Sequence, residues 1–453
     1  MCTLVSKYNV PGPRYTSYPT VPYWDPDTFS LLGWKGTITE SFNQSKDREG
    51  ISLYIHLPFC ESMCTFCGCN KRITKNHEVE VPYLRAVIRE LQLYVDLLRE
   101  RPLVSQLHLG GGTPTFFSPD HLDRLLSGIF SVAKKAVDFD GSFEGHPNNT
   151  KREHLQVLAS HGFTRVCYGV QDYNERVQRA IHRIQPFINV ERATTMAREE
   201  GYVSVGHDII YGLPFQTQED VISTIEKTIL LRPDRIAFYS YAHVPWIKGN
   251  GQRGFKETDL PSAEQKRLQY ETGKDLLLKA GYVEIGMDHF ALPTDDLYLS
   301  QQQGKLHRNF MGYATNPTQL MLGLGVSAIS DSWYGFAQNV KSVEEYQEMV
   351  NNGILPVYRG HLLTEEDLMV RKHILNIMCR FETYWEDTSL YFEEIPQVIT
   401  KLSELEKDGL VLLLPNGIRI TEKGRVFVRN ICLPFDLRLQ RKKPGTQLFS
   451  MTV

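Results

Sequence analysis

Short apolar segments alternate with longer amphipathic ones from residue 50 onward. The short segments have the length and composition of buried β-strands and cover residues 53–57, 106–109, 142–144, 165–170, 204–211 and 235–241. The clearest amphipathic segment is 83–100, where apolar residues recur at helical spacing along one face. Similar patterns predict helices over 119–136, 151–161, 190–201, 217–231 and 262–280.

Strand followed by helix, six times over, predicts an α/β fold built on a parallel sheet with right-handed crossovers. Because the helices are amphipathic, they can cover one face of the sheet and leave the other facing inward. The pattern therefore favours a curved, incomplete (β/α)6 barrel, with a flat doubly wound sheet as the alternative.

The segments on either side of this repeat differ from it. Residues 1–49 are rich in Pro, Gly, Tyr and Ser and predict an N-terminal arm instead of a packed unit; the barrel domain with its extension then covers 50–358. In 359–453, Thr364 is a candidate helix cap, and Asn416-Gly417 between two apolar runs predicts a hairpin after a helix near 394–408. We expect a mainly helical, winged-helix-like C-terminal domain. Because its candidate recognition helix has no basic stripe, a lid or structural role is favoured over DNA binding.

Composition narrows the class of protein. The 453 residues are 42% hydrophobic and 23% charged, and the net charge of −3 gives no indication of a nucleic-acid or anionic-membrane partner. No apolar stretch approaches the roughly 18 residues of a membrane span, and the N-terminus lacks an apolar signal core. We expect a cytoplasmic protein with reduced cysteines and no membrane span.

Four cysteines lie within ten residues, directly after the first predicted strand: Cys60, Cys64, Cys67 and Cys69. Zinc modules usually supply two separated cysteine pairs, and the remaining cysteines, at 2, 167, 379 and 432, are scattered singly. Cys60, Cys64 and Cys67 suit a [4Fe–4S] cluster held at three corners, with the fourth iron open to another ligand. Zinc and plain thiols are the alternative interpretations.

Polar and glycine positions follow the other predicted strands. Gly110-Gly-Gly-Thr-Pro114 follows the second strand and Glu144 ends the third, whereas Gln171, Asp208 and Ala242 lie in or after the last three. Because ligands of parallel βα folds bind where the strands end, these positions are expected to gather at one mouth.

These motifs together resemble those of radical S-adenosylmethionine (SAM) enzymes, and most closely those of the oxygen-independent coproporphyrinogen III oxidase family. The likeness extends over nearly the whole chain. It rests on the cysteine motif and the triple glycine together with the segments Tyr8-Asn-Val-Pro-Gly-Pro-Arg-Tyr-Thr-Ser-Tyr-Pro19, Tyr211-Gly-Leu-Pro214, Tyr241-Ala-His-Val-Pro245, Gly286-Met-Asp-His-Phe290, His307-Arg-Asn-Phe310, Gly325-Val-Ser-Ala-Ile-Ser330 and Gly424-Arg-Val-Phe-Val-Arg-Asn-Ile-Cys432.

The resemblance implies a role for individual residues. It implies Cys60, Cys64 and Cys67 as cluster ligands and Tyr54, Gly111 and Glu144 as contacts of a first SAM on the open iron. It implies a second SAM nearby, with the matching positions Phe66, Gly112, Thr113, Gln171, Arg183, Asp208, Ala242 and Ile329.

Two positions need separate comment. Cys69 completes the family pattern without being expected to bind iron, so it is either a catalytic residue beside Glu144 or a buried thiol. The family often shows Glu-x-Asp-Pro after the third strand, whereas this chain has His146 in place of the aspartate. The contribution of that acid is therefore in doubt, although Glu144 is retained.

The implied reaction converts two propionates of coproporphyrinogen III into vinyl groups and yields protoporphyrinogen IX for haem biosynthesis without oxygen. Hydrogens on the propionate β-carbons are not acidic, so a cofactor must supply the difficult step. The family chemistry removes one such hydrogen as an atom, after which carbon dioxide and one electron leave. A reduced flavodoxin- or ferredoxin-type donor and a monomeric enzyme are implied as well.

An anionic tetrapyrrole requires cationic contacts, and Arg14, Lys71, Arg72 and Arg308 are candidates, with solvated surface charges as the alternative. We expect the arm to fold over the mouth, so that Arg14 holds substrate. Three other functions stay open: a haem-degrading radical SAM methyltransferase, a haem carrier on the same fold, and a zinc-dependent regulator that uses the C-terminal unit.

Overall fold

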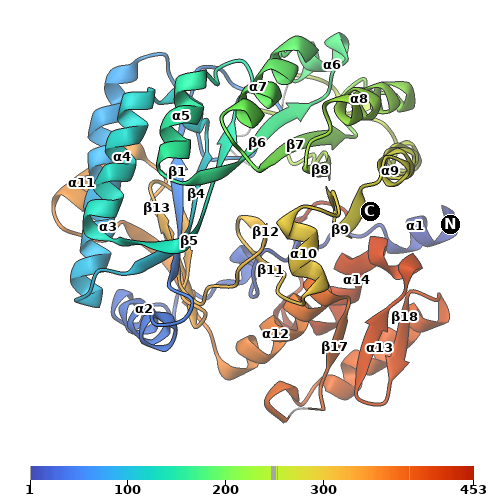
Figure 1. The fold of residues 1–453 in the computed structure, drawn as a ribbon. Helices are drawn as coiled ribbons and strands as arrows, with labels where there is room; N and C mark the ends of the chain where they lie inside the picture. The colour runs from blue at the N-terminus through green and yellow to red at the C-terminus, as the bar shows by residue number, and fades with distance from the viewer. Residues whose placement is uncertain (1, 246–250, 253, 387, 453) are drawn as a thin grey trace.

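The protein is built around one curved sheet of twelve strands, seen in a computed structural model that describes residues 2–245, 251–252, 254–386 and 388–452 (Figure 1). The strand order is β16-β15-β14-β13-β1-β4-β5-β6-β7-β8-β10-β9. Six neighbouring strands run parallel in chain order: β1 (Ile51–Leu57), β4 (Leu103–Gly111), β5 (Lys134–Gly145), β6 (Phe163–Gln171), β7 (Ser204–Tyr211) and β8 (Arg235–Ser240). The predicted six-unit parallel barrel is thereby confirmed.

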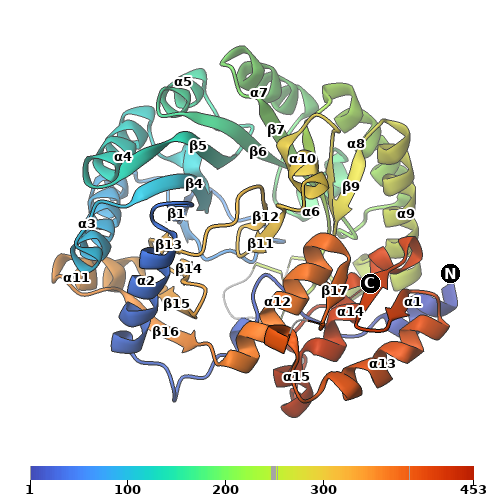
Figure 2. The same ribbon diagram turned by 60° about the horizontal axis from the view of Figure 1, so that its bottom comes forward.

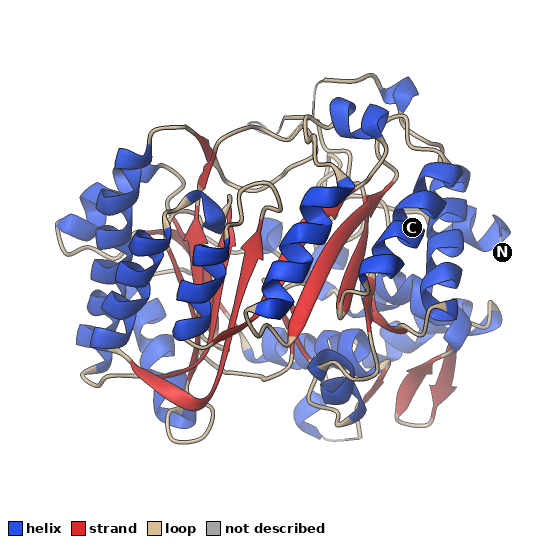
Figure 3. Cartoon of the chain, turned by 45° about the horizontal axis from the view of Figure 1, so that its top comes forward, coloured by secondary structure: helices blue, strands red, loops and turns tan. Residues whose placement is uncertain are grey.

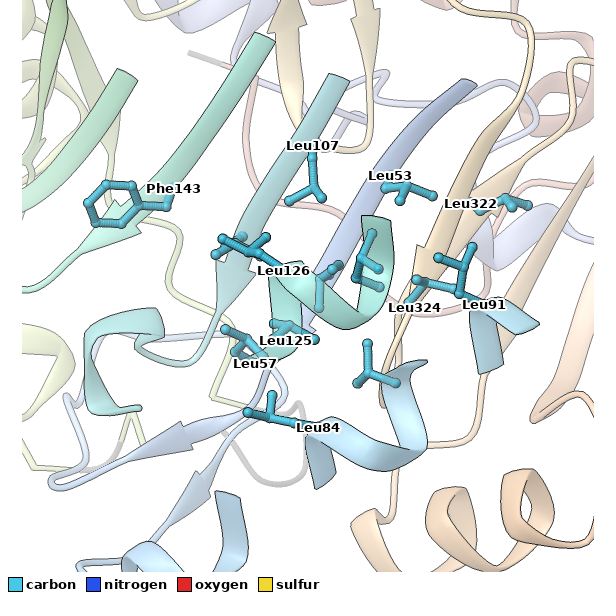
Figure 4. Close-up of a cluster of buried hydrophobic side chains, with 14 of the residues drawn as sticks. Leu53, Leu57, Leu84, Leu91, Leu107, Leu125, Leu126, Phe143, Leu322 and Leu324 are labelled. Atoms are coloured by element: carbon cyan, nitrogen blue, oxygen red, sulfur yellow. The ribbon is translucent and has the colours of Figure 1, made fainter. Parts of the chain in front are cut away.

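The crossover helices cover the outer face of this sheet (Figures 2 and 3). They are α3 (Glu80–Leu98), α4 (Pro119–Val132), α5 (Arg152–Ser160), α6 (Glu175–Ala180), α7 (Phe187–Glu199), α8 (Gln218–Leu231) and α9 (Ala263–Lys279). Their apolar faces meet alternate strand residues, such as Leu53 and Leu107 against Leu91 and Leu126, in a fully buried core (Figure 4). Because successive strand side chains point to opposite faces, the intervening residues face the interior of the barrel.

Strands outside the six units extend the sheet at both ends without closing it among the described residues. One end gains β9 (Val283–Gly286) and β10 (His289–Ala291); the other gains β13 (Met321–Leu324), β14 (Ile329–Asp331), β15 (Gly335–Asn339) and β16 (Val357–Leu362). Only β13, which pairs with β1, continues the parallel arrangement; the other added strands pair antiparallel. The hairpin of β11 (His307–Asn309) and β12 (Gly312–Ala314) lies inside the curve of the sheet (Figure 2).

The remaining short elements connect these parts. They are α10 (Asp296–Gln302), α11 (Val343–Asn351), the two-stranded pair β2 (Phe59–Cys60) and β3 (Arg72–Ile73), and 3-10 turns at Val21–Tyr23, His77–Val79, Pro114–Phe116, Glu257–Asp259, Thr388–Leu390, Glu422–Phe427 and Leu433–Phe435.

Two local predictions were wrong. Strand β5 begins at Lys134, eight residues before the predicted start at 142, because its first residues are mostly exposed and form no continuous apolar run. The first 49 residues were expected to form an unpacked arm, but they contain α1 (Cys2–Tyr8) and α2 (Leu31–Ser45). Helix α2 buries Trp34, Ile38 and Phe42 in the main core, so this part of the segment is packed.

The C-terminal segment contains the expected helices and hairpin. Its elements are α12 (Glu365–Arg380), β17 (Glu382–Tyr384), α13 (Ile395–Lys407), β18 (Val411–Leu414), β19 (Gly417–Ile420), α14 (Val428–Cys432) and α15 (Leu437–Arg441). Thr364 caps α12 as predicted. The two turn residues of the hairpin are Pro415 and Asn416, with Gly417 already paired to Leu414. The winged-helix comparison stays a prediction.

Both chain ends belong to this C-terminal side of the molecule (Figure 1). Pro11 forms a β-bridge with Met451, and the apolar core around α12 includes Val5, Tyr15 and Tyr18 from the N-terminal segment. Among the described residues, no helix combines the length and apolar character needed to cross a bilayer.

Candidate active site

A cavity of about 370 Å³ lies at the carboxyl ends of the parallel strands. All four clustered cysteines line it, and so do residues that follow or end β4, β5, β6 and β7. The predicted convergence of separate sequence motifs on one mouth of the barrel is therefore seen in the structure.

The cysteine loop is anchored at both ends. Strands β2 and β3 pair parallel, so the Arg72 N–H donates to the Pro58 carbonyl at 2.8 Å and the Thr74 N–H to the Cys60 carbonyl at 2.9 Å. Between them, the Lys71 ammonium donates to the carbonyl oxygens of Cys67 and Cys69 at 3.1 and 3.4 Å. These contacts hold the thiols at the rim of the cavity.

The thiols themselves have different environments. Burial raises the pKa of Cys60 to about 11, although the Thr113 hydroxyl lies 3.2 Å from its sulfur. Hydrogen bonding from Cys69 and the positive charge of Lys71 act in the other direction on Cys67 and lower its pKa. Cluster binding deprotonates such thiols whatever their pKa in the free protein, because the thiolate is the ligand.

These residues fit a cluster of several irons better than one ion. Among the described residues, no group of three or more His, Cys, Asp or Glu side chains converges on a single metal position. In a [4Fe–4S] cubane each thiolate binds a different iron, so the ligands surround a volume instead of a point. Cys60, Cys64 and Cys67 all line the cavity, as this kind of ligand set requires.

The triple glycine brings backbone close to the mouth. Gly111 has φ +112°, and a Cβ there would lie 2.7 Å from the His56 ring. A Cβ on Gly112 would lie 2.6 Å from the Pro58 carbonyl group. Both positions therefore require glycine, since a side chain would collide with the strand that carries the cysteines.

Glu144 ends β5 at the floor of the cavity. Its carboxylate accepts from the Gly111 N–H at 3.2 Å and lies 3.7 Å from His108 Nε2. Burial would raise the pKa of Glu144, but His108 and the Gly111 N–H outweigh it and leave the pKa below its usual value. Tyr54 stacks on His108 with ring centroids 6.1 Å apart, which fixes the imidazole beside the carboxylate.

Three further predicted residues line the cavity. Arg183 donates to the Gly169 carbonyl at 2.7 Å and lies 3.9 Å from the sulfur of Cys64. Gln171 has φ +68° and is buried, so its backbone is held in an uncommon conformation at the end of β6. Burial raises the pKa of Asp208 to about 7, while the Cys167 thiol donates to it at 3.2 Å.

Comparison with known proteins assigns this site to a family. The radical SAM superfamily model matches residues 54–228. Oxygen-independent coproporphyrinogen III oxidase from Helicobacter pylori is 39% identical over 99% of this chain and 98% of the relative, and the Escherichia coli K12 enzyme is 39% identical over 99% and 98%.

The solved structure of Escherichia coli coproporphyrinogen III oxidase, described as a radical SAM enzyme, superposes with a TM-score of 0.88. It is 36% identical, and the match covers 96% of this chain and 98% of that one. The chain belongs to the oxygen-independent coproporphyrinogen III oxidases. Membership of this radical SAM family implies a [4Fe–4S] cluster and SAM as cofactors.

Most residues predicted for the cofactors of this coproporphyrinogen oxidase lie together. The cavity lining includes Cys60, Cys64, Cys67, Cys69, Phe66, Gly111, Gly112, Thr113, Glu144, Gln171, Arg183 and Asp208. Tyr54 lies directly behind it, against His108. Ala242 lines a separate pocket, and Ile329 belongs to β14 in the antiparallel extension; neither lines the cavity of the cysteines.

Two of the candidate substrate residues, Arg14 and Arg308, do not line the cavity of the cysteines. Arg14 pairs with Asp288 at 3.5 Å, and Arg308 is only 5% exposed, with its guanidinium 4.7 Å from the Tyr313 ring centroid. Arg308 is thus not the solvated surface charge that was the alternative interpretation. Of the other two candidates, Arg72 forms an ion pair with exposed Glu344, whereas Lys71 is tied to the cysteine loop.

Several site residues of this oxidase were missed. A second cavity of about 170 Å³ shares Glu144, Cys167 and Asp208 with the first and is lined by polar residues deeper in the barrel, such as His108, Asp140, Arg165 and Arg235. Strand alternation gave a usable signal, because His56 and His108 alternate with buried leucines on β1 and β4 and must face the interior.

Proposed function

We propose that this chain converts two propionate side chains of coproporphyrinogen III into vinyl groups, giving protoporphyrinogen IX in porphyrin biosynthesis. The main support for the proposal is that coproporphyrinogen III oxidases align with 99% of this chain at 39% identity. The cysteine loop, the triple glycine and Glu144, which meet at one cavity, support it.

We assign Cys60, Cys64 and Cys67 to the cluster, and Tyr54, Gly111 and Glu144 to the SAM molecule beside it. The residues proposed to hold a second SAM are Phe66, Gly112, Thr113, Gln171, Arg183, Asp208, Ala242 and Ile329. When bound, the cluster and SAM supply the one-electron chemistry that an unactivated carbon–hydrogen bond requires.

The chain's own residues position and shield these groups. Glu144 offers a carboxylate that is ionised and already oriented by Gly111 and His108, so it can accept hydrogen bonds from a nucleoside hydroxyl or an ammonium. Cys69 reaches the same cavity without being needed as a cluster ligand, and we assign it a catalytic role. His146 replaces the usual acid; because burial lowers its pKa to about 3, it is neutral and cannot substitute for a charge.

Substrate binding is proposed to use Arg14 and Arg308. The Nε and NH1 groups of Arg308 are buried and have no hydrogen-bond partner within the described part of the chain. A carboxylate of the substrate would satisfy them, since a buried donor without a partner is unfavourable. The enzyme is further proposed to act as a cytoplasmic monomer with a reduced flavodoxin- or ferredoxin-type donor.

The decisive experiment is anaerobic incubation of the reconstituted protein with dithionite, SAM and coproporphyrinogen III, followed by mass analysis of the tetrapyrrole. The expected product is lighter than coproporphyrinogen III by two molecules of carbon dioxide and four hydrogen atoms. A parallel incubation with haem tests for methylated or ring-opened products, and haem binding without any SAM cleavage tests for a carrier. Unchanged coproporphyrinogen together with either of those results would overturn the proposal.

A further inference from the structure

A further pocket, different from the two cavities that share Glu144, opens at the carboxyl ends of β7 and β8. It has a volume of about 450 Å³ and is lined by Gly212 and residues 240–243 from these strand ends, together with Arg14 and Lys266. The same two cations also line an adjoining cavity of about 50 Å³ that contains Asp288. Two cationic side chains from distant parts of the sequence therefore meet at this rim.

Lys266 has an unusual place for a lysine. Its ammonium donates to the Tyr241 carbonyl at 3.2 Å, and no carboxylate of the residues that the structure describes forms an ion pair with it. The aliphatic stem lies over Gly212, where a Cβ would be 2.7 Å from the lysine Cε. Gly212 thus provides the space that lets Lys266 lie across the end of β7.

The charges around Lys266 leave a positive excess. Arg14, Arg308 and Arg429 all act on the carboxylate of Asp288, which Arg14 approaches to 3.5 Å. The other carboxylate of the smaller cavity, Glu284, pairs with Lys274 at 2.6 Å. Glu257, the one carboxylate on the larger pocket among the described residues, is exposed and pairs with neither cation. Burial and the charge of Arg14 lower the pKa of Lys266 to about 8, as expected for an ammonium that lacks a counter-ion.

One buried side chain connects the wall of this pocket to the cysteine loop of the cofactor site. The buried amide of Gln252 donates to the Phe66 carbonyl at 3.3 Å, on the cysteine loop, and to the Ala242 carbonyl at 3.0 Å, on the pocket wall. The pocket wall and the cysteine loop are therefore neighbours at the mouth of the barrel.

We propose that Lys266, together with Arg14, binds carboxylate groups of the tetrapyrrole substrate that are not reacting, and so holds the macrocycle while another propionate faces the cofactors. This inference rests on the proposed function, because it takes a tetracarboxylate as the ligand. In this proposal, Lys266 of helix α9 contacts the substrate, and the absence of a side chain at Gly212 leaves room for the lysine.

The test uses full-length reconstituted protein and compares Lys266→Met with Lys279→Met, which removes an exposed lysine from the last turn of the same helix. Coproporphyrin III, an unreactive tetracarboxylate, is titrated anaerobically and its binding followed by fluorescence. KM for coproporphyrinogen III is measured alongside, with iron content and thermal unfolding as checks on folding.

Lys266→Met is expected to weaken porphyrin binding and raise KM by about tenfold or more, because a charge-assisted hydrogen bond is lost. The tetramethyl ester of coproporphyrin, which lacks the charges, should bind wild type and variant equally. Porphyrin affinity and KM within twofold of wild type for Lys266→Met would overturn the inference and leave the proposed function intact. If the wild-type protein binds coproporphyrin in a Lys266-dependent way but converts no coproporphyrinogen, the proposed function fails instead.

Discussion

At the scale of single residues, the proposed cluster ligands differ in position from two of the other cysteines. Cys60, Cys64 and Cys67 face the cavity, whereas Cys379 and Cys432 are buried in the C-terminal core. Under the proposed assignment, removing one of these three thiols leaves two ligands for the cluster, whereas removing a core thiol leaves all three.

Cys64→Ala is therefore expected to lower bound iron and sulfide at least tenfold, since even outer-shell changes weaken metal sites about 10–100-fold. Iron, acid-labile sulfide and visible absorbance are measured after anaerobic reconstitution. Cys379→Ala serves as the control, and this variant should bind as much iron as the wild-type protein. Equal iron in the two variants would rule out Cys64 as a ligand.

Glu144→Gln is expected to weaken SAM binding by about 10–100-fold, because a charged acceptor becomes neutral while the cluster stays in place. Equilibrium dialysis of SAM against reconstituted protein measures the change. The control, Asp138→Asn, removes an exposed carboxylate from the same strand. A variant with normal SAM affinity would show that Glu144 acts elsewhere in the reaction.

The site could be predicted in part, because parallel strands bring their carboxyl ends together whatever their separation in sequence. That rule placed Glu144, Gln171 and Asp208 on one cavity. It could not place Lys266, because its contact with Gly212 depends on how α9 packs, and it could not show that Arg308 is buried beneath the arm. Charged residues look alike in sequence whether they are solvated or enclosed.

At the scale of elements, Glu90 shows how a helix is tied to the sheet. This buried α3 carboxylate accepts from the Tyr346 hydroxyl at 2.6 Å, the Asn339 amide at 2.7 Å and the Gly325 N–H at 2.8 Å. Burial outweighs these three donors and raises the pKa of Glu90 to about 7. Helix α3, α11 and the turn after β13 thus meet at one titratable group.

The raised pKa means that the folded protein binds more protons than the unfolded chain between about pH 4.5 and 7. The contribution of protonated Glu90 to the unfolding free energy is therefore fully present below about pH 4.5 and is lost as the pH rises through about 7. Over that window the unfolding free energy of wild type should fall by about 3 kcal/mol relative to Glu90→Gln, whose amide does not titrate. Urea unfolding of both proteins at several pH values measures the difference. A constant difference would contradict the assignment.

Helix α2 supplies a direct test of how the N-terminal segment packs. Trp34 is fully buried, whereas Leu32 on the same helix is 82% exposed. Trp34→Ala is expected to lower the unfolding free energy by about 3–5 kcal/mol, and Leu32→Ala by less than about 0.5 kcal/mol. Chemical denaturation measures both, and equal effects would mean that the helix is not part of the core.

The elements that sequence patterns predicted well are those whose periodicity matches one buried face. Six strands and their helices satisfy this condition. Helix α2 was not predicted because Gly33 and Gly36 lower its helix propensity, although Trp34, Ile38 and Phe42 follow helical spacing. Strands β13 to β16 were not predicted because each has only three to six residues, and such short strands are defined by their pairing partners, which local sequence does not reveal.

At the scale of the whole molecule, the division into an arm, a barrel domain and a C-terminal domain stays a prediction. One apolar cluster contains Tyr15 from the first segment, Ile285 and Tyr313 from the second, and Ile374 from the third. Residues from all three segments thus share a core, so unfolding one should destabilise the others.

The two chain termini are joined through one buried side chain. The Arg429 guanidinium donates to the carbonyl oxygens of Gly12, Pro13 at 2.9 Å and Met451 at 2.8 Å, and Pro11 pairs with Met451. The next residue of the arm is Arg14. The C-terminal tail therefore sets the position of the arm that carries a proposed substrate contact.

Ending the chain after Phe449 removes the Met451 and Thr452 contacts with the arm. KM for coproporphyrinogen III is expected to rise about tenfold or more, because small displacements of a positioning group are costly. Iron content and SAM affinity should not change, since the tail does not line the cysteine cavity. Met451→Ala keeps the backbone contacts and should behave as wild type. A truncated enzyme with an unaltered KM would show that Arg14 is held by its contacts with Asp288 and Ser240 alone.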